Sequence, residues 1–271
     1  MNQTKGCFAK INGTSIYYEV KGEGNPLLLI HGLPVDSRMW DGQFEVLSQQ
    51  YKVIRFDLAG FGLSGVHDED YSLLNDVKSL LDYLQISRTS LLGFSVGGKL
   101  SIEFALTYPE MVDRLILASS GLTGWTEESI DKQRYNEEVN KCFQSGDQEC
   151  AIELMTNAWV IGPYRNNEEV RQDVQERFSV MVKNTFAKPR GQGKLLFPDI
   201  NSFELIEQIK VHTLIILPEF DFPDFNQIGD YLHKKIKNSK KITIKNTAHM
   251  LNMEEPSVFN KLVLQFLQQN R

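Results

Sequence analysis

A serine between two glycines marks the segment Gly93-Phe94-Ser95-Val96-Gly97, a pattern typical of serines that act as nucleophiles. The apolar run 89–92 precedes this segment, and a helix-forming stretch follows it. In a tight strand-to-helix turn, glycines two residues before and after the serine remove side chains that would clash with neighbouring backbone. We therefore expect the Ser95 hydroxyl to stand above a sheet, beneath a substrate.

A nucleophilic serine needs a base that takes its proton, and the chain offers five histidines. His249 follows the last predicted strand, 241–244, and so lies on a loop at the same sheet edge as Ser95. We predict that His249 is the base. The remaining histidines are predicted to have structural or surface roles; they are His31, His67, His212 and His233.

The base in turn needs a carboxylate that orients it. Asp221 follows the predicted strand 213–217 and so reaches the same edge of the sheet. Glu219 and Asp224 lie nearby in the sequence and compete for this role. We predict Asp221, which gives the chain order serine, aspartate, histidine that is associated with this type of sheet.

Acyl transfer also needs hydrogen-bond donors for the oxyanion that develops on the carbonyl. The segment His31-Gly32-Leu33-Pro34 follows the apolar run 27–30, and Gly32 permits a close approach of backbone. We predict that the amides of Leu33 and Val96 form the oxyanion hole, because Pro34 has no amide hydrogen to donate.

Apolar side chains near these turns are candidates for a pocket wall that favours a small, mainly hydrophobic substrate. Core packing is the competing interpretation for each of them. Phe94 and Met39 are favoured because they adjoin the turns that form the site. The full set of candidates is Met39, Trp40, Phe94, Trp125, Trp159 and Met250.

A second glycine pattern, in residues 60–65, matches the Gly-x-Gly-x-x-Gly motif of dinucleotide sites and follows the predicted strand 53–56. Such a site needs the motif to open a helix whose amino terminus receives the pyrophosphate. Here the chain runs into the acidic segment 67–70, which would repel phosphate. We therefore predict no nucleotide cofactor. The spacing of cysteines and histidines predicts no metal site.

The elements that must position these residues alternate between strands and helices. Apolar runs at 27–30, 53–56, 89–92 and 213–217 are separated by helical patterns. Near-continuous apolar runs suit strands that are covered on both faces. The sequence therefore predicts an α/β fold with a mostly parallel central sheet flanked by helices. The early run 16–20 is predicted to belong to an antiparallel hairpin.

The alternation stops between residues 122 and 210, where helical stretches rich in polar residues follow one another. Excursions at the carboxyl edge of an open α/β sheet build its ligand crevice. We expect residues 1–121 and 211–271 to form the core, and residues 122–210 to form an inserted helical cap, or lid.

Composition limits the class of protein. The 271 residues are 41% hydrophobic and 24% charged, which is ordinary for a soluble globular protein. The net charge of −6 argues against a nucleic-acid binder. The sequence contains neither an apolar leader nor a stretch of membrane-spanning length, so we expect a cytoplasmic protein. Cys7, Cys142 and Cys150 are expected to be reduced, structural thiols. Oligomeric state is left open.

Taken together, these motifs resemble the α/β-hydrolase family over nearly the whole chain. The matching pieces are residues 31–34, the turn 57–64, the elbow 93–97, Asp221 and His249. The resemblance implies a catalytic triad completed by the serine of the elbow, oxyanion amides at the two positions already named, and a structural role for the turn 57–64.

Two features qualify what the resemblance implies. Relatives that dehalogenate or hydrate epoxides carry aspartate at the elbow, so Ser95 argues against both reactions. Many relatives have glycine where Pro218 stands, and residues 222–225 are bulkier and more acidic than the usual segment after the acid.

The resulting hypothesis is a lidded serine hydrolase, most simply a carboxylesterase that works through an acyl-enzyme without a cofactor. Alternatives with the same triad are a lactonase, a carbon-carbon bond hydrolase and a perhydrolase. From another class comes a small-molecule sensing or signalling protein that retains the triad. The carbon-carbon substrate would carry a carboxylate and need a cation facing the pocket; candidates are Arg38, Lys99, Arg134, Arg165 and Arg190.

Overall fold

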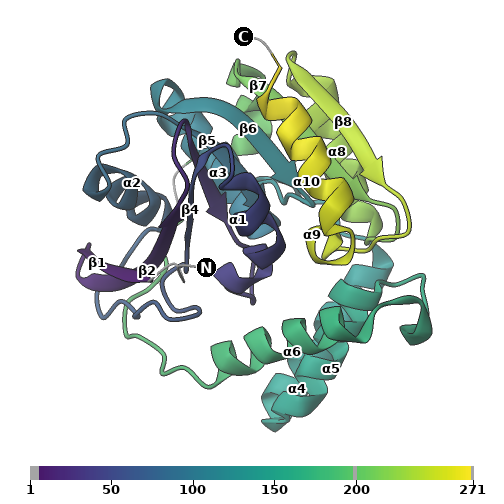
Figure 1. Ribbon diagram of the computed structural model, residues 1–271. Coiled ribbons are helices and arrows are strands. Elements are labelled where there is room, and N and C mark those ends of the chain that lie inside the picture. Colours follow the sequence, from purple (N-terminus) through teal and green to yellow (C-terminus); the bar gives the residue numbers. More distant parts are fainter. Residues whose placement is uncertain (1–5, 198–199, 270–271) are drawn as a thin grey trace.

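The computed structural model describes residues 6–197 and 200–269 and has an eight-stranded sheet at its centre (Figure 1). The strands lie in the order β1-β2-β4-β3-β5-β6-β7-β8. β1 pairs with β2, and β2 with β4, in antiparallel fashion, whereas all other neighbours are parallel. The strands are β1 (Cys7–Ile11), β2 (Thr14–Lys21), β3 (Pro26–Ile30), β4 (Lys52–Phe56), β5 (Thr89–Phe94), β6 (Val112–Ala118), β7 (His212–Pro218) and β8 (Ser239–Ile244). The predicted α/β fold with a mostly parallel sheet is confirmed.

The central strands are apolar throughout because successive side chains face two different helical layers. In β3, Leu28 and Ile30 belong to one buried cluster, and Leu27 and Leu29 belong to the other. The first cluster includes residues of α2 (Leu73–Tyr83), α3 (Val96–Thr107) and α8 (Pro223–Lys235). The second includes residues of α1 (Asp41–Leu47), α9 (Leu251–Glu254) and α10 (Pro256–Leu267).

Between β6 and β7 the chain forms a group of helices, which Figure 1 shows together, apart from the layers that cover the sheet. These are α4 (Ile130–Ser145), α5 (Gln148–Thr156), the π-helical turn Asn157–Ile161 and α6 (Gln172–Phe186). α7 (Ser202–Leu205) leads back to the sheet. The short 3-10 turns of the chain are Ser37–Trp40, Pro109–Met111, Asn167–Glu169 and Ile206–Gln208.

Local sequence sets the ends of α4 and α5. The Ser129 side chain accepts a hydrogen bond from the amide of Lys132 and caps the start of α4. Gly146 ends α4 in the left-handed conformation, at φ 74°, which glycine adopts without steric cost. Asp147 follows at once and caps α5 through the amide of Cys150. The two helices therefore form a tight hairpin.

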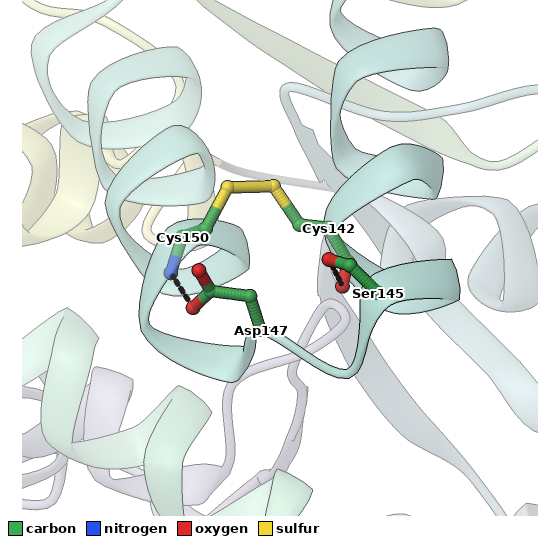
Figure 2. Close-up of a disulfide and its surroundings, with 4 residues drawn as sticks. All are labelled: Cys142, Ser145, Asp147 and Cys150. Atoms are coloured by element: carbon green, nitrogen blue, oxygen red, sulfur yellow. Dashed lines mark hydrogen bonds between the residues drawn. A yellow bond between two sulfur atoms is a disulfide. The ribbon is translucent and has the colours of Figure 1, made fainter.

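That hairpin brings two cysteines together, and Cys142 and Cys150 form a disulfide (Figure 2). Their Cα atoms are 5.8 Å apart, a separation usual for this bond. The prediction of reduced thiols is therefore wrong for this pair. The cysteine pattern did not indicate the contact, because it depends on the turn between the two helices.

Replacing Cys142 and Cys150 together by serine is expected to lower the free energy of unfolding by about 2.5 kcal/mol. The bond closes a loop with a sequence separation of 8, so its loss restores conformational freedom to the unfolded chain. Urea unfolding with and without a thiol reductant measures the change. The double serine variant should not respond to reductant; a wild type equally insensitive under conditions that cleave the bond would contradict the prediction.

No helix in the described ranges 6–197 and 200–269 is long and apolar enough to span a bilayer.

Candidate active site

Ser95 lies at the junction of β5 and α3, in a backbone conformation that few residues adopt. Its φ is 53° and its ψ −114°, a strained combination for a residue with a side chain. The surrounding backbone holds it there: the Ser95 amide donates to the Ala118 carbonyl at 2.9 Å, and the Gly121 amide donates to the Ser95 carbonyl at 3.1 Å. This is the strand-to-helix elbow that the sequence pattern predicts.

Two glycines allow the loop after β3 to pack directly on this elbow. A Cβ atom on Gly97 would lie 2.2 Å from the Ile30 carbonyl oxygen. A Cβ atom on Gly32 would lie 2.8 Å from Cδ1 of Phe94 and 3.0 Å from Cβ of Ser95. Because neither glycine carries a side chain, the turn that contains Leu33 runs against Ser95.

Asp221 and His249 meet through a hydrogen bond at the carboxyl end of the sheet. His249 Nδ1 donates to Asp221 Oδ2 at 2.6 Å. Asp221 follows β7, His249 follows β8, and both residues are buried, with 1% and 4% of their surface exposed. The carboxylate also accepts a bond from the Phe222 amide at 2.8 Å. An imidazole held in this way keeps Nε2 free of a proton, so that atom can accept one.

The two competing carboxylates have other partners. Glu219 accepts bonds from Lys245 Nζ at 2.8 Å and from the Asn246 amide at 2.9 Å. Asp224 accepts bonds from the amide and the hydroxyl of Ser129, which begins α4. Of the three candidates, Asp221 is the one that contacts the imidazole.

Three aromatic rings surround the His249 imidazole. The ring centroids of Phe225, Trp159 and Phe94 lie 4.5, 4.7 and 4.9 Å from its own. Trp159 comes from the helical insertion, and its carbonyl also accepts a bond from the Met250 amide at 3.3 Å. Sequence reasoning missed Phe225. The signal was Pro223, which starts α8 two residues after Asp221 and so turns the next helical residues back toward the site.

A cavity of about 490 Å³ opens at Ser95. Val96 is the first residue of α3, so its amide has no partner within the helix, and both Val96 and Leu33 line the cavity. The predicted wall residues Trp125 and Trp159 line it as well. Met39, Trp40 and Met250 are not among its lining residues and are buried in the core cluster beside α1 and α10, as is Phe94.

A second cavity, of about 630 Å³, lies between the loop after β4 and helices of the insertion. Phe61 and Tyr71 line it from the core, and Phe143 and Phe186 from the insertion. Leu33 lines both cavities. The second cavity does not include Ser95 in its lining.

His31 makes structural contacts, as predicted, and the glycine pattern forms turns. The His31 Nδ1 atom donates to the Gly32 carbonyl at 2.7 Å, and its Nε2 atom accepts from the Leu58 amide at 2.9 Å. Burial lowers the pKa of His31, which suits a neutral ring with one donor and one acceptor. Residues 60–65 form turns instead of opening a helix, and α2 begins only at Leu73.

The turn at Asp57 holds this region together. Asp57 Oδ1 accepts a bond from the Ser37 amide at 2.8 Å, and Oδ2 accepts one from the Leu63 amide at 2.7 Å.

The buried His67 ring bonds Asp76 at 2.9 Å and stacks on Tyr71. His212 is exposed, His233 bonds Ser239, and neither lines the two cavities.

A buried ion pair stands behind the His249 loop. Arg165 Nη1 lies 2.7 Å from Glu254 Oε2, with 4% and 7% of the two side chains exposed. Glu254 Oε1 accepts a bond from the Ala248 amide at 2.7 Å, and Arg165 donates to the carbonyls of Val160 and Ile161 at 2.9 and 2.8 Å. The pair therefore connects the loop of the imidazole to the helical insertion. Sequence reasoning considered Arg165 only as a pocket cation.

Replacing Arg165 by methionine is expected to destabilise the protein by about 3–5 kcal/mol at pH 7, because Glu254 is then a buried charge without a counter-ion. Burial raises the pKa of Glu254, while Arg165 opposes that rise. When a carboxyl has a raised pKa in the folded state, the protein loses stability as pH rises from the unfolded to the folded pKa value of that carboxyl. The deficit should therefore shrink as pH falls from 7 toward the unfolded pKa of a glutamate, and most of the change should lie above that value.

Urea unfolding of wild type and variant at pH 7 and at pH 4.5 measures this effect. Adding Glu254→Gln to Arg165→Met should restore part of the stability at pH 7, because the unpaired charge is gone. A deficit that is equal at both pH values would contradict the explanation. Lys78→Gln, which breaks an exposed pair with Asp82, serves as the control and should change stability little.

Comparisons with known proteins agree with this architecture. The alpha/beta hydrolase fold family matches residues 25–256. An uncharacterised protein of Mycobacterium tuberculosis is 38% identical over 117 residues, which are 42% of this chain but only 34% of that relative. The pimeloyl-[acyl-carrier protein] methyl ester esterase of Aliivibrio fischeri is 26% identical over 249 residues, 87% of this chain and 91% of that enzyme.

Among solved structures, a hydrolase from Pseudomonas aeruginosa PA01 superposes with a TM-score of 0.78 at 25% identity, over 99% of this chain and 100% of that one. The family match covers the elbow, the Asp221 turn and the His249 loop in one stretch. The chain therefore belongs to the α/β-hydrolase fold family.

Proposed function

We propose that the protein is a serine hydrolase that cleaves a small, mainly apolar ester or related carbonyl compound through an acyl-enzyme. The observation that carries the proposal is the 2.6 Å bond between His249 and Asp221 at the sheet edge where the Ser95 elbow stands. A carboxylate, an imidazole and a strained serine at one edge are the parts that acyl transfer requires.

In the proposed reaction, Ser95 Oγ attacks the carbonyl carbon while His249 Nε2 takes the hydroxyl proton. Asp221 holds the proton on Nδ1 and stabilises the imidazolium that forms. His249 then gives the proton to the leaving alcohol as the tetrahedral species collapses to an acyl-enzyme. Water, deprotonated by the same imidazole, attacks the acyl carbon and forms a second tetrahedral species. As this species collapses, His249 returns the proton to Ser95 Oγ and the acid is released.

The oxyanion of each tetrahedral species accepts hydrogen bonds from the amides of Val96 and Leu33. The Val96 amide points along the start of α3, where the helix dipole also favours negative charge. The close packing of Gly32 on Ser95 brings the Leu33 turn to the same place. Neither donor depends on a flexible side chain, so both are held ready before substrate binds.

Residues 122–210 act as a lid in this proposal. Trp159 of the insertion packs on His249, and Asp224 holds the start of α4 through Ser129. Trp125 and Trp159 give the cavity apolar walls, which supports a hydrophobic acyl or alcohol group in the substrate. The relative from Aliivibrio fischeri is named as a methyl ester esterase, which supports an ester as the starting choice.

Labelling with an alkyl fluorophosphonate tests the proposal directly. The reagent should phosphonylate Ser95 stoichiometrically, and peptide mass spectrometry identifies the modified residue. The untreated protein should turn over short-chain 4-nitrophenyl esters steadily. Prior treatment with the fluorophosphonate should abolish this turnover. A single burst of nitrophenol without further turnover would favour a sensing protein that is acylated once, and labelling at another serine would refute the assignment.

A further inference from the structure

The cavity at Ser95 is lined by two lysines, and they differ in their partners. Lys132 Nζ lies 3.4 Å from Glu128 Oε1 and 3.9 Å from Asp224 Oδ1. Lys99 also lines the cavity, but within the described parts of the chain no carboxylate lies within ion-pair distance of it. Its ammonium group stands 5.1 Å from the centroid of the Phe197 ring instead. Lys99 therefore lines the cavity without an ion pair, although its charge also opposes the rise that burial causes in the pKa of Glu103, one turn further along α3.

The position of Lys99 relative to Ser95 is fixed by the helix. The Lys99 amide donates to the Ser95 carbonyl at 3.0 Å, so Lys99 lies one turn further along α3. Gly121, which also bonds the Ser95 carbonyl and lines the cavity, packs against the base of the lysine side chain: a Cβ atom on it would be 3.8 Å from Lys99 Cβ. The Lys99 side chain thus begins beside the elbow, among the residues that line the cavity.

The rest of the lining is mainly apolar and contains two acidic residues. Besides Val96, its apolar members are Leu33, Leu122, Trp125, Trp159, Phe225 and Ile228. Glu128 is exposed and already paired with Lys132, and Glu127 is exposed to solvent. A half-buried lysine beside apolar walls suits a ligand with an apolar body and one anionic end.

We propose that Lys99 is a specificity residue that binds a carboxylate on the substrate, so that the preferred substrates are monoesters or lactones that carry a free carboxylate. This inference rests on the proposed function and adds no chemical step to it. The carboxylate remains intact, and Lys99 contributes through a charge-assisted hydrogen bond that a neutral analogue cannot make.

Matched pairs of esters test the inference. One pair is 4-nitrophenyl hydrogen succinate and its methyl ester, which differ by one charge in the acyl group. The other is 4-carboxyphenyl butyrate and phenyl butyrate, which differ by one charge in the leaving group. In at least one pair, wild type should prefer the anion in kcat/KM, and Lys99→Gln should reduce that preference about ten-fold, mainly through KM.

Three comparisons make the result specific to Lys99. Lys99→Arg should retain most of the preference, because the positive charge remains. Lys132→Gln should leave the preference nearly unchanged, because Lys132 is already neutralised by acids. Raising the salt concentration should weaken the preference of wild type but not the turnover of the neutral esters.

The inference fails if wild type prefers the anion in neither pair, or if Lys99→Gln slows anionic and neutral esters equally. It also fails if Lys132→Gln and Lys99→Gln reduce the preference to the same extent, since the effect would then belong to the whole cavity. These outcomes leave the proposed function intact, provided that the neutral esters are still turned over and Ser95→Ala abolishes that turnover. Absence of turnover of every ester in wild type would instead count against the proposed function.

Discussion

Replacing Ser95 by alanine is expected to reduce kcat for 4-nitrophenyl butyrate by about a thousand-fold or more. The substitution removes the only atom that forms the acyl bond in the proposed reaction, while Asp221 and His249 keep their hydrogen bond. The amides of Val96 and Leu33 also remain, so some rate above that in water should persist. Initial rates of nitrophenol release at neutral pH measure the change.

Ser120→Ala is the matched control for this experiment. Ser120 is also buried, and it lies in the segment that follows β6, but its hydroxyl donates to the Gly121 carbonyl at 2.8 Å. Its loss should change kcat less than ten-fold. Equal turnover in wild type and Ser95→Ala would remove Ser95 from the mechanism, whatever the geometry around it.

The sheet edge could be predicted because parallel strands deliver their carboxyl ends to the same side. Ser95 follows β5, Asp221 follows β7 and His249 follows β8; β5 and β7 were visible as apolar runs, and β8 as the shorter segment 241–244. The spacing of the glycines around Ser95 indicated the elbow, because a serine between two glycines after a buried strand is typical of this turn. Sequence reasoning was strongest for residues whose position is set by the end of a strand.

Side-chain partners across the fold were harder to predict. Met39 and Trp40 follow the turn 31–34 in the sequence, and Met250 follows His249. All three are nevertheless buried in the core cluster that α1 and α10 cover. Whether a large apolar side chain faces a cavity or a helix depends on tertiary packing, which its position beside a motif does not specify. Trp125 and Trp159 line the cavity because the insertion carries them there.

The disulfide and the ion pair behind His249 were hidden for a related reason. Cys142 and Cys150 meet only because Gly146 reverses the chain between two helices. Arg165 and Glu254 are 89 positions apart by their numbers and meet where the insertion packs on the loop of the imidazole. Neither contact leaves a periodic pattern in the sequence.

Replacing Asp221 by asparagine is expected to reduce kcat by about ten-thousand-fold near neutral pH. An asparagine amide can donate to Nδ1 of His249, which favours the tautomer that carries its proton on Nε2. That nitrogen could then no longer accept the proton of Ser95, although every heavy atom stays in place. Rates between pH 6 and pH 10 test this, with circular dichroism to verify that the variant is folded.

The control for the Asp221 substitution is the same change at Asp224, three residues further along the chain. Asp224→Asn should weaken the cap that Asp224 provides for Ser129 at the start of α4, and so affect the insertion more than the imidazole. We expect kcat to fall less than ten-fold, with any larger change in KM. Should Asp224→Asn cause the greater loss of kcat, Asp224 and not Asp221 would orient His249 during turnover. The 2.6 Å bond between His249 and Asp221 would then belong to a resting arrangement that the reaction does not use.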